Sequence, residues 1–367
     1  MSIVGLIAGC GSGGSEAEVS AQTEDALPSD LTVRFVTAGE QAGWVAGVGG
    51  DQREVRLWRL TPDGGAAQVA ELPELVSMDS AGIETQVAVA GLRCIEGDPA
   101  EGCGASRGEV LLITDTGEIS SVTLYDDDTN LDNGDGLAIA GTTRDSLWIS
   151  TERGLFEVSA QGAVVRELPD ATGGECVIDD TLYRVVSAEP SAGPIEGSSP
   201  PVTTIGPTQQ ATDRQTIEIQ RLDGDTFTPV PGGGQELDGD AYPNLSCTGS
   251  AWEAGRANGV LTDRWTPTEG WHATRGMPAP RGAPAAATAG LSTGQEAFAL
   301  SPEGAVLERG PDGTFSAAGI RLPDLSEPEQ IPASLIADRS PSMVVACTSR
   351  STSQTDTETV CQSVAAG

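Results

Sequence analysis

Three stretches of the chain decide the fold: LWRLTPDGGAAQVAEL (57–72), VLLITDTGEISSVTL (110–124) and LFEVSAQGAVVREL (155–168). Each contains an apolar segment, a polar turn with a glycine and a second apolar segment. The pattern returns in IEIQRLDGDTFTPV (217–230), DRWTPTEGWHATR (263–275) and AVLERGPDGTFSAAG (305–319). Gly next to Asp, Glu or Gln supplies the positive φ that tight hairpin turns require. We therefore predict six β-hairpins.

The spacing of these hairpins predicts how they assemble. Their turn glycines recur at intervals of 43 to 62 residues and are Gly64, Gly117, Gly162, Gly224, Gly270 and Gly313. Hairpins repeating at such a period are typical of a β-propeller. Further short strands precede most of them, at 43–48, 87–90, 146–150 and 296–300. With one more inner strand each, every unit becomes a four-stranded blade.

We expect an all-β fold, a β-propeller domain over residues 31–367, with seven four-stranded blades; six or eight are the alternatives. The blades are placed near 31–75, 76–126, 134–170, 174–232, 242–280, 284–324 and 331–365. The last unit lacks a fourth strand. Residues 31–36 are expected to supply it, so that an N-terminal strand closes the ring and removes the exposed sheet edges.

The N-terminus indicates export. Ile7-Ala8-Gly9-Cys10 matches a bacterial lipobox, in which the Cys10 thiol carries the lipid, so residues 1–10 are interpreted as the remnant of a lipoprotein signal. The apolar stretch before it is short and has no basic residue, which indicates an upstream start. Residues 11–30 follow as a flexible Gly/Ser/acidic tether. No stretch is long enough to span a membrane, so we expect anchoring by lipid alone.

The cysteines favour the same compartment. Without Cys10 six remain, an even number, and disulfides form in oxidising environments. Proximity in sequence predicts Cys94–Cys103 and Cys347–Cys361 as bridges across single hairpins, which leaves Cys176 and Cys247 to join two neighbouring blades. No CxxC is present, which disfavours a metal–thiolate site.

Charge excludes several partners. With 20 Lys+Arg and 54 Asp+Glu, the net charge is −34, so nucleic acid and anionic lipid surfaces would be repelled. We interpret the acidity first as a solvated surface; adaptation to high salt, a cationic partner and Ca²⁺ are the alternatives.

Few residues suggest a chemical site. Asp128, Asn130 and Asp132 alternate as in a D-x-N-x-D calcium loop, but Asn133 and Ile139 stand where an EF-hand needs Gly and Glu, so a solvated loop is the main interpretation. His272 is the one histidine and is expected to be structural. Residues 189–213 form a Pro/Ser/Thr-rich insertion, either a lid over a binding face or a plain extension.

Taken together, the lipobox and the repeats resemble bacterial β-propeller lipoproteins of the WD40/YVTN-like kind. The resemblance concerns architecture, since no WD or YVTN motif occurs, and it implies no particular catalytic residues. We expect an exported, lipid-anchored monomer without cofactor, on the outer face of the cell membrane or in the periplasm. It would bind a protein or an envelope polysaccharide as a scaffold. The alternative is a secreted hydrolase or lyase with carboxylate- or Ca²⁺-assisted chemistry in the propeller channel.

Overall fold

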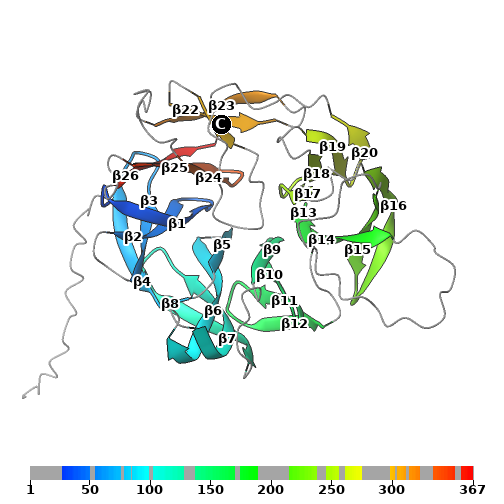
Figure 1. The fold of residues 1–367 in the computed structure, drawn as a ribbon, viewed down its shortest axis with the longest axis horizontal. Coiled ribbons are helices and arrows are strands. Elements are labelled where there is room, and N and C mark those ends of the chain that lie inside the picture. Colours follow the sequence, from blue (N-terminus) through cyan, green and yellow to red (C-terminus); the bar gives the residue numbers. More distant parts are fainter. Residues whose placement is uncertain are drawn as a thin grey trace, which may run out of the picture.

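The repeated hairpins fold into seven antiparallel sheets arranged as a ring, a seven-bladed β-propeller (Figure 1). The structure is a computed structural model that describes residues 27–49, 54–75, 78–83, 85–98, 102–127, 137–169, 174–188, 215–237, 245–255, 261–274, 298–301, 304–310, 314–322, 334–351 and 357–366. The regular elements among these residues are all β-strands, and no helix occurs in this part of the chain. The predicted fold class and number of blades are confirmed.

The blades follow one another along the chain, and in each the strands pair in sequence order. Blade 1 contains β1 (Leu31–Ala38), β2 (Gly43–Gly49), β3 (Val55–Leu60) and β4 (Ala66–Leu72); blade 2 contains β5 (Met78–Ile83), β6 (Gln86–Asp98), β7 (Gly102–Ile113) and β8 (Ile119–Asp127). Blade 3 contains β9 (Ala138–Thr142), β10 (Ser146–Thr151), β11 (Gly154–Ser159) and β12 (Val164–Leu168); blade 4 contains β13 (Glu175–Ile178), β14 (Thr181–Ala188), β15 (Gln215–Asp223) and β16 (Thr226–Leu237); blade 5 contains β17 (Leu245–Cys247), β18 (Trp252–Gly255), β19 (Leu261–Thr266) and β20 (Gly270–Ala273). Among the described residues, blade 6 contains β21 (Phe298–Leu300), β22 (Ala305–Arg309) and β23 (Phe315–Arg321), and blade 7 contains β24 (Ser334–Arg339), β25 (Met343–Ser351) and β26 (Thr357–Ala365).

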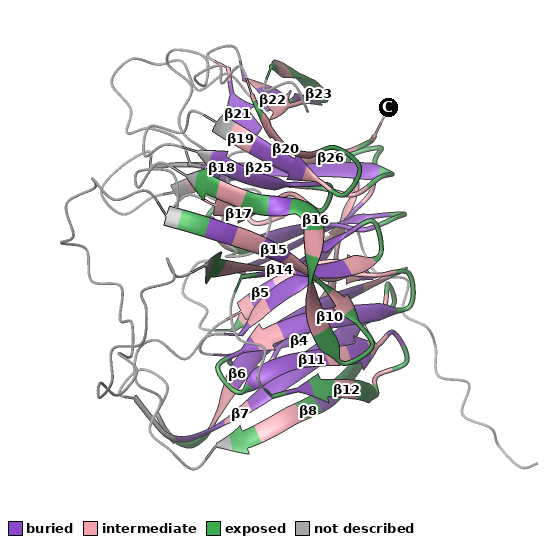
Figure 2. Ribbon diagram, turned by 90° about the vertical axis from the view of Figure 1, so that its right-hand side faces the viewer, coloured by how far each residue is buried: buried purple, intermediate pink, exposed green. Residues whose placement is uncertain are grey.

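Because neighbouring strands are antiparallel, their connections alternate between two faces of the ring. One face, here called the turn face, carries tight turns such as 39–42, 61–65 and 114–118. Figure 2 views the ring from its edge and places the exposed tight turns on one side. The other face, here called the loop face, holds the strand ends that the longest connections join; the connections themselves, 128–136, 189–214 and 275–297, lie outside the described residues.

The hydrophobic core lies between the blades. One cluster joins β6 of blade 2 to β10 of blade 3, for example Ala88 to Ile149, and other clusters span the next junctions in the same way. Both faces of each sheet are therefore covered, which explains why Val87, Ala88, Val89 and Ala90 are all fully buried. Short continuous apolar runs, rather than strict alternation, are the sequence signal of such strands.

The ring closes between blade 7 and blade 1, but the predicted strand pairing is wrong. Residues 31–36 belong to β1, which pairs with β2 as the innermost strand of blade 1 and not with blade 7. Contact with blade 7 comes from the chain just before and within β1, where the Thr359 amide donates to the Ser29 carbonyl at 2.7 Å. Local alternation in 31–36 predicted a strand correctly, but pairing depends on non-local packing that a single strand does not encode.

The turn glycines have the predicted conformation. Gly64, Gly117, Gly162, Gly224 and Gly270 have φ between 62° and 90°, while Gly313 lies outside the described residues. At Gly117 the need is twofold, because a Cβ there would meet the Val69 carbonyl oxygen of β4 at 1.8 Å. The turn of blade 2 thus packs directly on the outermost strand of blade 1.

Replacing Gly117 separates these two requirements. We expect Gly117→Ala to lower the free energy of unfolding by about 2 kcal/mol more than Gly224→Ala, whose Cβ would meet nothing within 4 Å. Both substitutions place alanine at positive φ, so the difference isolates the contact with Val69. Urea unfolding of the two variants measures it, and equal losses would show that the blade 1–blade 2 contact is not tight.

Candidate functional site

Buried polar side chains gather on the innermost strands of the ring. Thr37 on β1, Asp79 on β5 and Glu175 on β13 are at most 8% exposed, and Asp338 on β24 keeps only part of its surface accessible. A propeller brings its innermost strands together around one axis, so this is where converging groups form a site if there is one.

Two of these acids bind the backbone of the next blade. Asp338 Oδ2 accepts a hydrogen bond from the Ala38 amide at 2.8 Å, which joins blade 7 to blade 1. Asp79 Oδ2 accepts one from the Ile139 amide at 2.7 Å, which joins blade 2 to blade 3. Between them, the hydroxyl oxygens of Thr37 and Ser80 lie 2.6 Å apart and connect blade 1 to blade 2. These contacts form a polar belt, defined as Thr37, Asp79, Ser80 and Asp338.

Burial perturbs one member of the polar belt. The pKa of Asp338 is raised to about 6, chiefly by desolvation and to a smaller extent by the negative charge of Asp79, while hydrogen bonds from the Ala38 and Arg339 amides act in the opposite direction. A carboxyl group with such a pKa can hold a proton near neutral pH. The belt therefore places a carboxyl group with a raised pKa on an innermost strand.

The raised pKa of Asp338 predicts a pH dependence of stability. Because the folded state binds this proton more tightly than the unfolded chain, its contribution to the free energy of unfolding grows as pH falls from about 7 towards 4, by at most about 3 kcal/mol. Asp338→Asn keeps an oxygen acceptor for Ala38 and removes the charge. We expect the variant to be more stable than the parent at pH 8, with the difference vanishing near pH 4. Thermal melts across this range measure it; parallel profiles would contradict the assignment.

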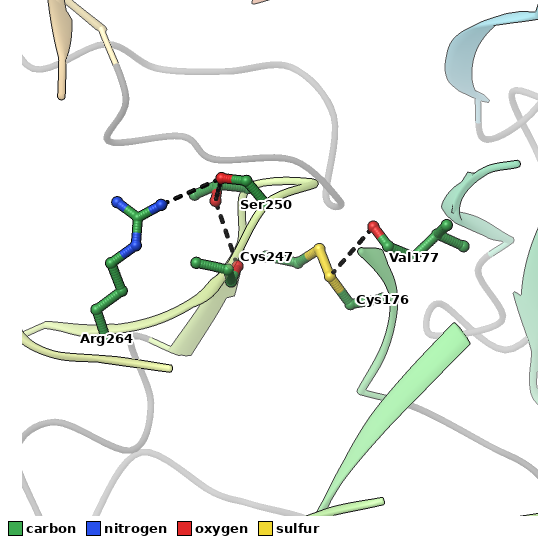
Figure 3. Close-up of a disulfide and its surroundings, with 7 residues drawn as sticks. Cys176, Val177, Cys247, Ser250 and Arg264 are labelled. Atoms are coloured by element: carbon green, nitrogen blue, oxygen red, sulfur yellow. Dashed lines mark hydrogen bonds between the residues drawn. A yellow bond between two sulfur atoms is a disulfide. The ribbon is translucent and has the colours of Figure 1, made fainter. Parts of the chain in front are cut away.

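Two disulfides lie wholly among the described side chains, and both have the predicted partners. Cys176–Cys247 joins β13 to β17, the innermost strands of blades 4 and 5, with Cα atoms 5.9 Å apart (Figure 3). Cys347–Cys361 joins directly opposed residues of β25 and β26 in blade 7. Cys94 lies on β6 opposite β7, while the Cys103 side chain lies outside the described residues, so the Cys94–Cys103 pairing stays a prediction.

The two bridges close loops of different length. Cys176 and Cys247 are 71 residues apart, against 14 for Cys347 and Cys361. Chain entropy predicts losses of about 4 and about 3 kcal/mol when each pair is replaced by alanines. Chemical denaturation of the two double variants measures these losses. No loss for the Cys176/Cys247 pair would mean that this bridge does not restrain the chain.

A buried ion-pair cluster joins blades 5 and 6. Glu253 on β18, 3% exposed, contacts Arg264 Nη1 at 3.4 Å and also pairs with Arg309 on β22. Arg264 in turn donates to Ser250 Oγ at 3.2 Å, close to the Cys176–Cys247 bridge (Figure 3). Two guanidinium groups thus share one carboxylate, an arrangement that satisfies the buried charges within the protein.

A shallow pocket of about 10 Å³, room for roughly one water molecule, lies on the turn face between blades 1 and 2. Trp44, Arg59 and Asp115 are among its lining residues. It is smaller than the 300–1,000 Å³ that small-molecule sites usually occupy. It therefore adds no candidate site.

Most of the site residues that the sequence predicts do not belong to the polar belt. Cys10 and the calcium candidates Asp128, Asn130 and Asp132 lie outside the described residues, as does the insertion 189–213. His272 lies on β20, the outermost strand of blade 5, with Nδ1 3.9 Å from Glu269 Oε2. It is thus on a different strand of the ring from the polar belt.

Sequence reasoning missed the polar belt and the Glu253 cluster. Asp79 and Asp338 were two acids among 54, and only their places within short innermost strands mark them. Among the residues that the structure describes, no three His, Cys, Asp or Glu side chains gather as metal ligands would. The described chain also contains no helix long and apolar enough to cross a membrane.

Comparisons with known proteins do not assign a function to this chain. No family model and no curated protein matches the sequence. Solved structures similar to this chain include "YCF48 bound to D1 peptide" (12% identity, TM-score 0.46, 92% of this chain and 95% of that one), a prolyl endopeptidase (12%, 0.44, 88% and 46%) and a subtype N10 neuraminidase-like protein of A/little yellow-shouldered bat/Guatemala/060/2010 (11%, 0.32, 93% and 96%). At these identities and scores the likenesses support no functional argument, and what the chain itself displays is a seven-bladed β-propeller.

Proposed function

We propose that this chain is a lipid-anchored β-propeller of the bacterial envelope that binds a protein or polysaccharide partner without chemical turnover. The observation that carries the proposal is the use of the buried acids. Asp338 and Asp79 each accept a backbone hydrogen bond from the next blade, and Glu253 is shared between two arginines. Groups engaged in this way hold the ring together and present a rigid scaffold.

Export and anchoring rest on two features. The Ile7-Ala8-Gly9-Cys10 tetrad supplies a lipid attachment site, and the disulfides Cys176–Cys247 and Cys347–Cys361 favour an oxidising compartment. Because the loop face holds the strand ends that the longest connections join, it is the surface on which partner-binding residues are expected.

Cell fractionation tests the anchor. We expect the parent chain, expressed in a bacterium with an intact export signal, to sediment with membranes, and Cys10→Ala to be released into the soluble fraction with its disulfides intact. Equal distribution of the two would contradict lipid attachment at Cys10. Cys10 is outside both observed bridges, so its loss leaves the propeller unchanged.

A secreted hydrolase is the second candidate, because the pKa of Asp338 near 6 suits a general acid. Purified Cys10→Ala chain incubated with envelope polysaccharide distinguishes the two. We expect saturable binding or none, with no release of fragments. Fragment release that is lost in Asp338→Asn would overturn the non-enzymatic proposal in favour of the hydrolase.

A further inference from the structure

One face of blade 5 carries a line of tryptophans that begins at a cysteine. Cys247 on β17 lies directly opposite Trp252 on β18. Trp252 lies opposite Trp265 on β19, which in turn lies opposite Trp271 on β20. Directly opposed residues of antiparallel strands project from the same face of a sheet, with Cβ atoms about 5 Å apart. The line therefore runs from the innermost strand of the blade to its outermost strand.

Blade 4 adds a tyrosine from the other side of the junction. Cys176 on β13 lies opposite Tyr183 on β14, and the Tyr183 ring meets the Trp265 ring edge-on, with centroids 5.1 Å apart. The Cys176–Cys247 bridge joins the inner ends of the two blades (Figure 3), and it belongs to the same packed cluster as these rings. The rings are here called the aromatic row, defined as Tyr183, Trp252, Trp265 and Trp271.

Burial changes along the aromatic row. Trp252 and Trp265 are 4% and 1% exposed, whereas Trp271 is half-buried and its Nε1 donates to the Gly233 carbonyl at 3.0 Å. In the part of the chain that the structure describes, no acceptor lies within hydrogen-bonding distance of the indole N–H of Trp252 or Trp265. An indole that has lost an electron is trapped when it passes its N–H proton to an acceptor. A positive charge on the two inner indoles therefore stays free to move outward to Trp271, which water reaches.

The disulfide at the inner end of the aromatic row is an electron acceptor. An indole excited by near-ultraviolet light is a strong one-electron donor, and a disulfide that takes up one electron becomes a radical anion. The bond between its two sulfur atoms then breaks, which leaves one thiolate and one thiyl radical. The electron lost by the row leaves a radical cation, which ends on Trp271 and releases its N–H proton to water. One electron thus moves from indole to sulfur, and one proton leaves at the outer strand.

We propose that the aromatic row is an electron-transfer route through which near-ultraviolet light opens the Cys176–Cys247 bridge. Cys176 is 0% and Cys247 6% exposed, so a thiol reagent has little access to either sulfur atom in the folded protein. The row reaches the bridge without local unfolding. Opening removes a covalent tie between the innermost strands of blades 4 and 5, which makes the stability of the ring responsive to light. This property goes beyond partner binding and does not depend on the lipid anchor.

Illumination at wavelengths that tryptophan absorbs and tyrosine does not tests the route. New thiols are alkylated after denaturation in the dark and assigned to each cysteine by mass spectrometry. Trp271→Phe keeps a ring that does not give up an electron, whereas Trp271→Tyr keeps one that does. We expect the thiol yield at Cys176 and Cys247 to fall several-fold in Trp271→Phe and to recover in Trp271→Tyr. Trp148→Phe, which alters a tryptophan of another cluster, should keep the yield of the parent.

Two references separate electron transfer from a change in folding. Both Trp271 variants lose the hydrogen bond to Gly233, so their melting temperatures in the dark should agree. Cys347–Cys361 shares a cluster with Trp58 instead, and its thiol yield should be the same in both variants. Equal yields at Cys176–Cys247 in the parent and both Trp271 variants would overturn the proposal, because the nearest indole alone would then explain the cleavage. No new thiol at this bridge in the illuminated parent would overturn it as well.

Discussion

Closure of the ring is the constraint on which the rest of this structure depends. Each blade is covered on both faces only if blade 7 meets blade 1, and that junction joins residues about 300 positions apart. Asp338 binds the Ala38 amide, Ser340 Oγ donates to the Gly39 carbonyl, and Thr359 binds the chain at Ser29 and Leu31. Leu31, Val45, Trp58 and Val345 fill the apolar part of the same junction. Loop-closure entropy opposes such distant contacts, so several have to form together.

The polar groups inside the ring follow from this constraint. Strands at the centre present backbone amides that the neighbouring blade has to satisfy, and unsatisfied buried amides are costly. Asp79 and Asp338 meet that need, and the burial that makes them useful also raises the pKa of Asp338. The raised pKa of Asp338 is thus explained by the role of this side chain in joining two blades. The 54 acids against 20 basic residues give the chain its net charge of −34, which favours solubility.

Much of the fold could be predicted because its signals are local. Turn glycines such as Gly117 and Gly162 need positive φ whatever surrounds them, and their period reveals the blades. The Cys176–Cys247 bridge could be predicted because each cysteine begins a neighbouring blade. The pairing of residues 31–36 could not, because the strand carries no mark of which neighbour it will meet. The polar belt escaped prediction for the same reason: Asp79 is distinguished only by the Ile139 amide of the next blade.

Native-state hydrogen exchange at increasing denaturant tests ring closure most directly. A closed ring unfolds as one unit, so the amides of β2 and β25 should open with the same free energy as those of β10 in blade 3. An open arc of stacked blades would instead fray from its ends. If the amides of blade 7 or blade 1 exchange through a separate opening of lower free energy, while blade 3 stays protected, the closed ring described here is contradicted.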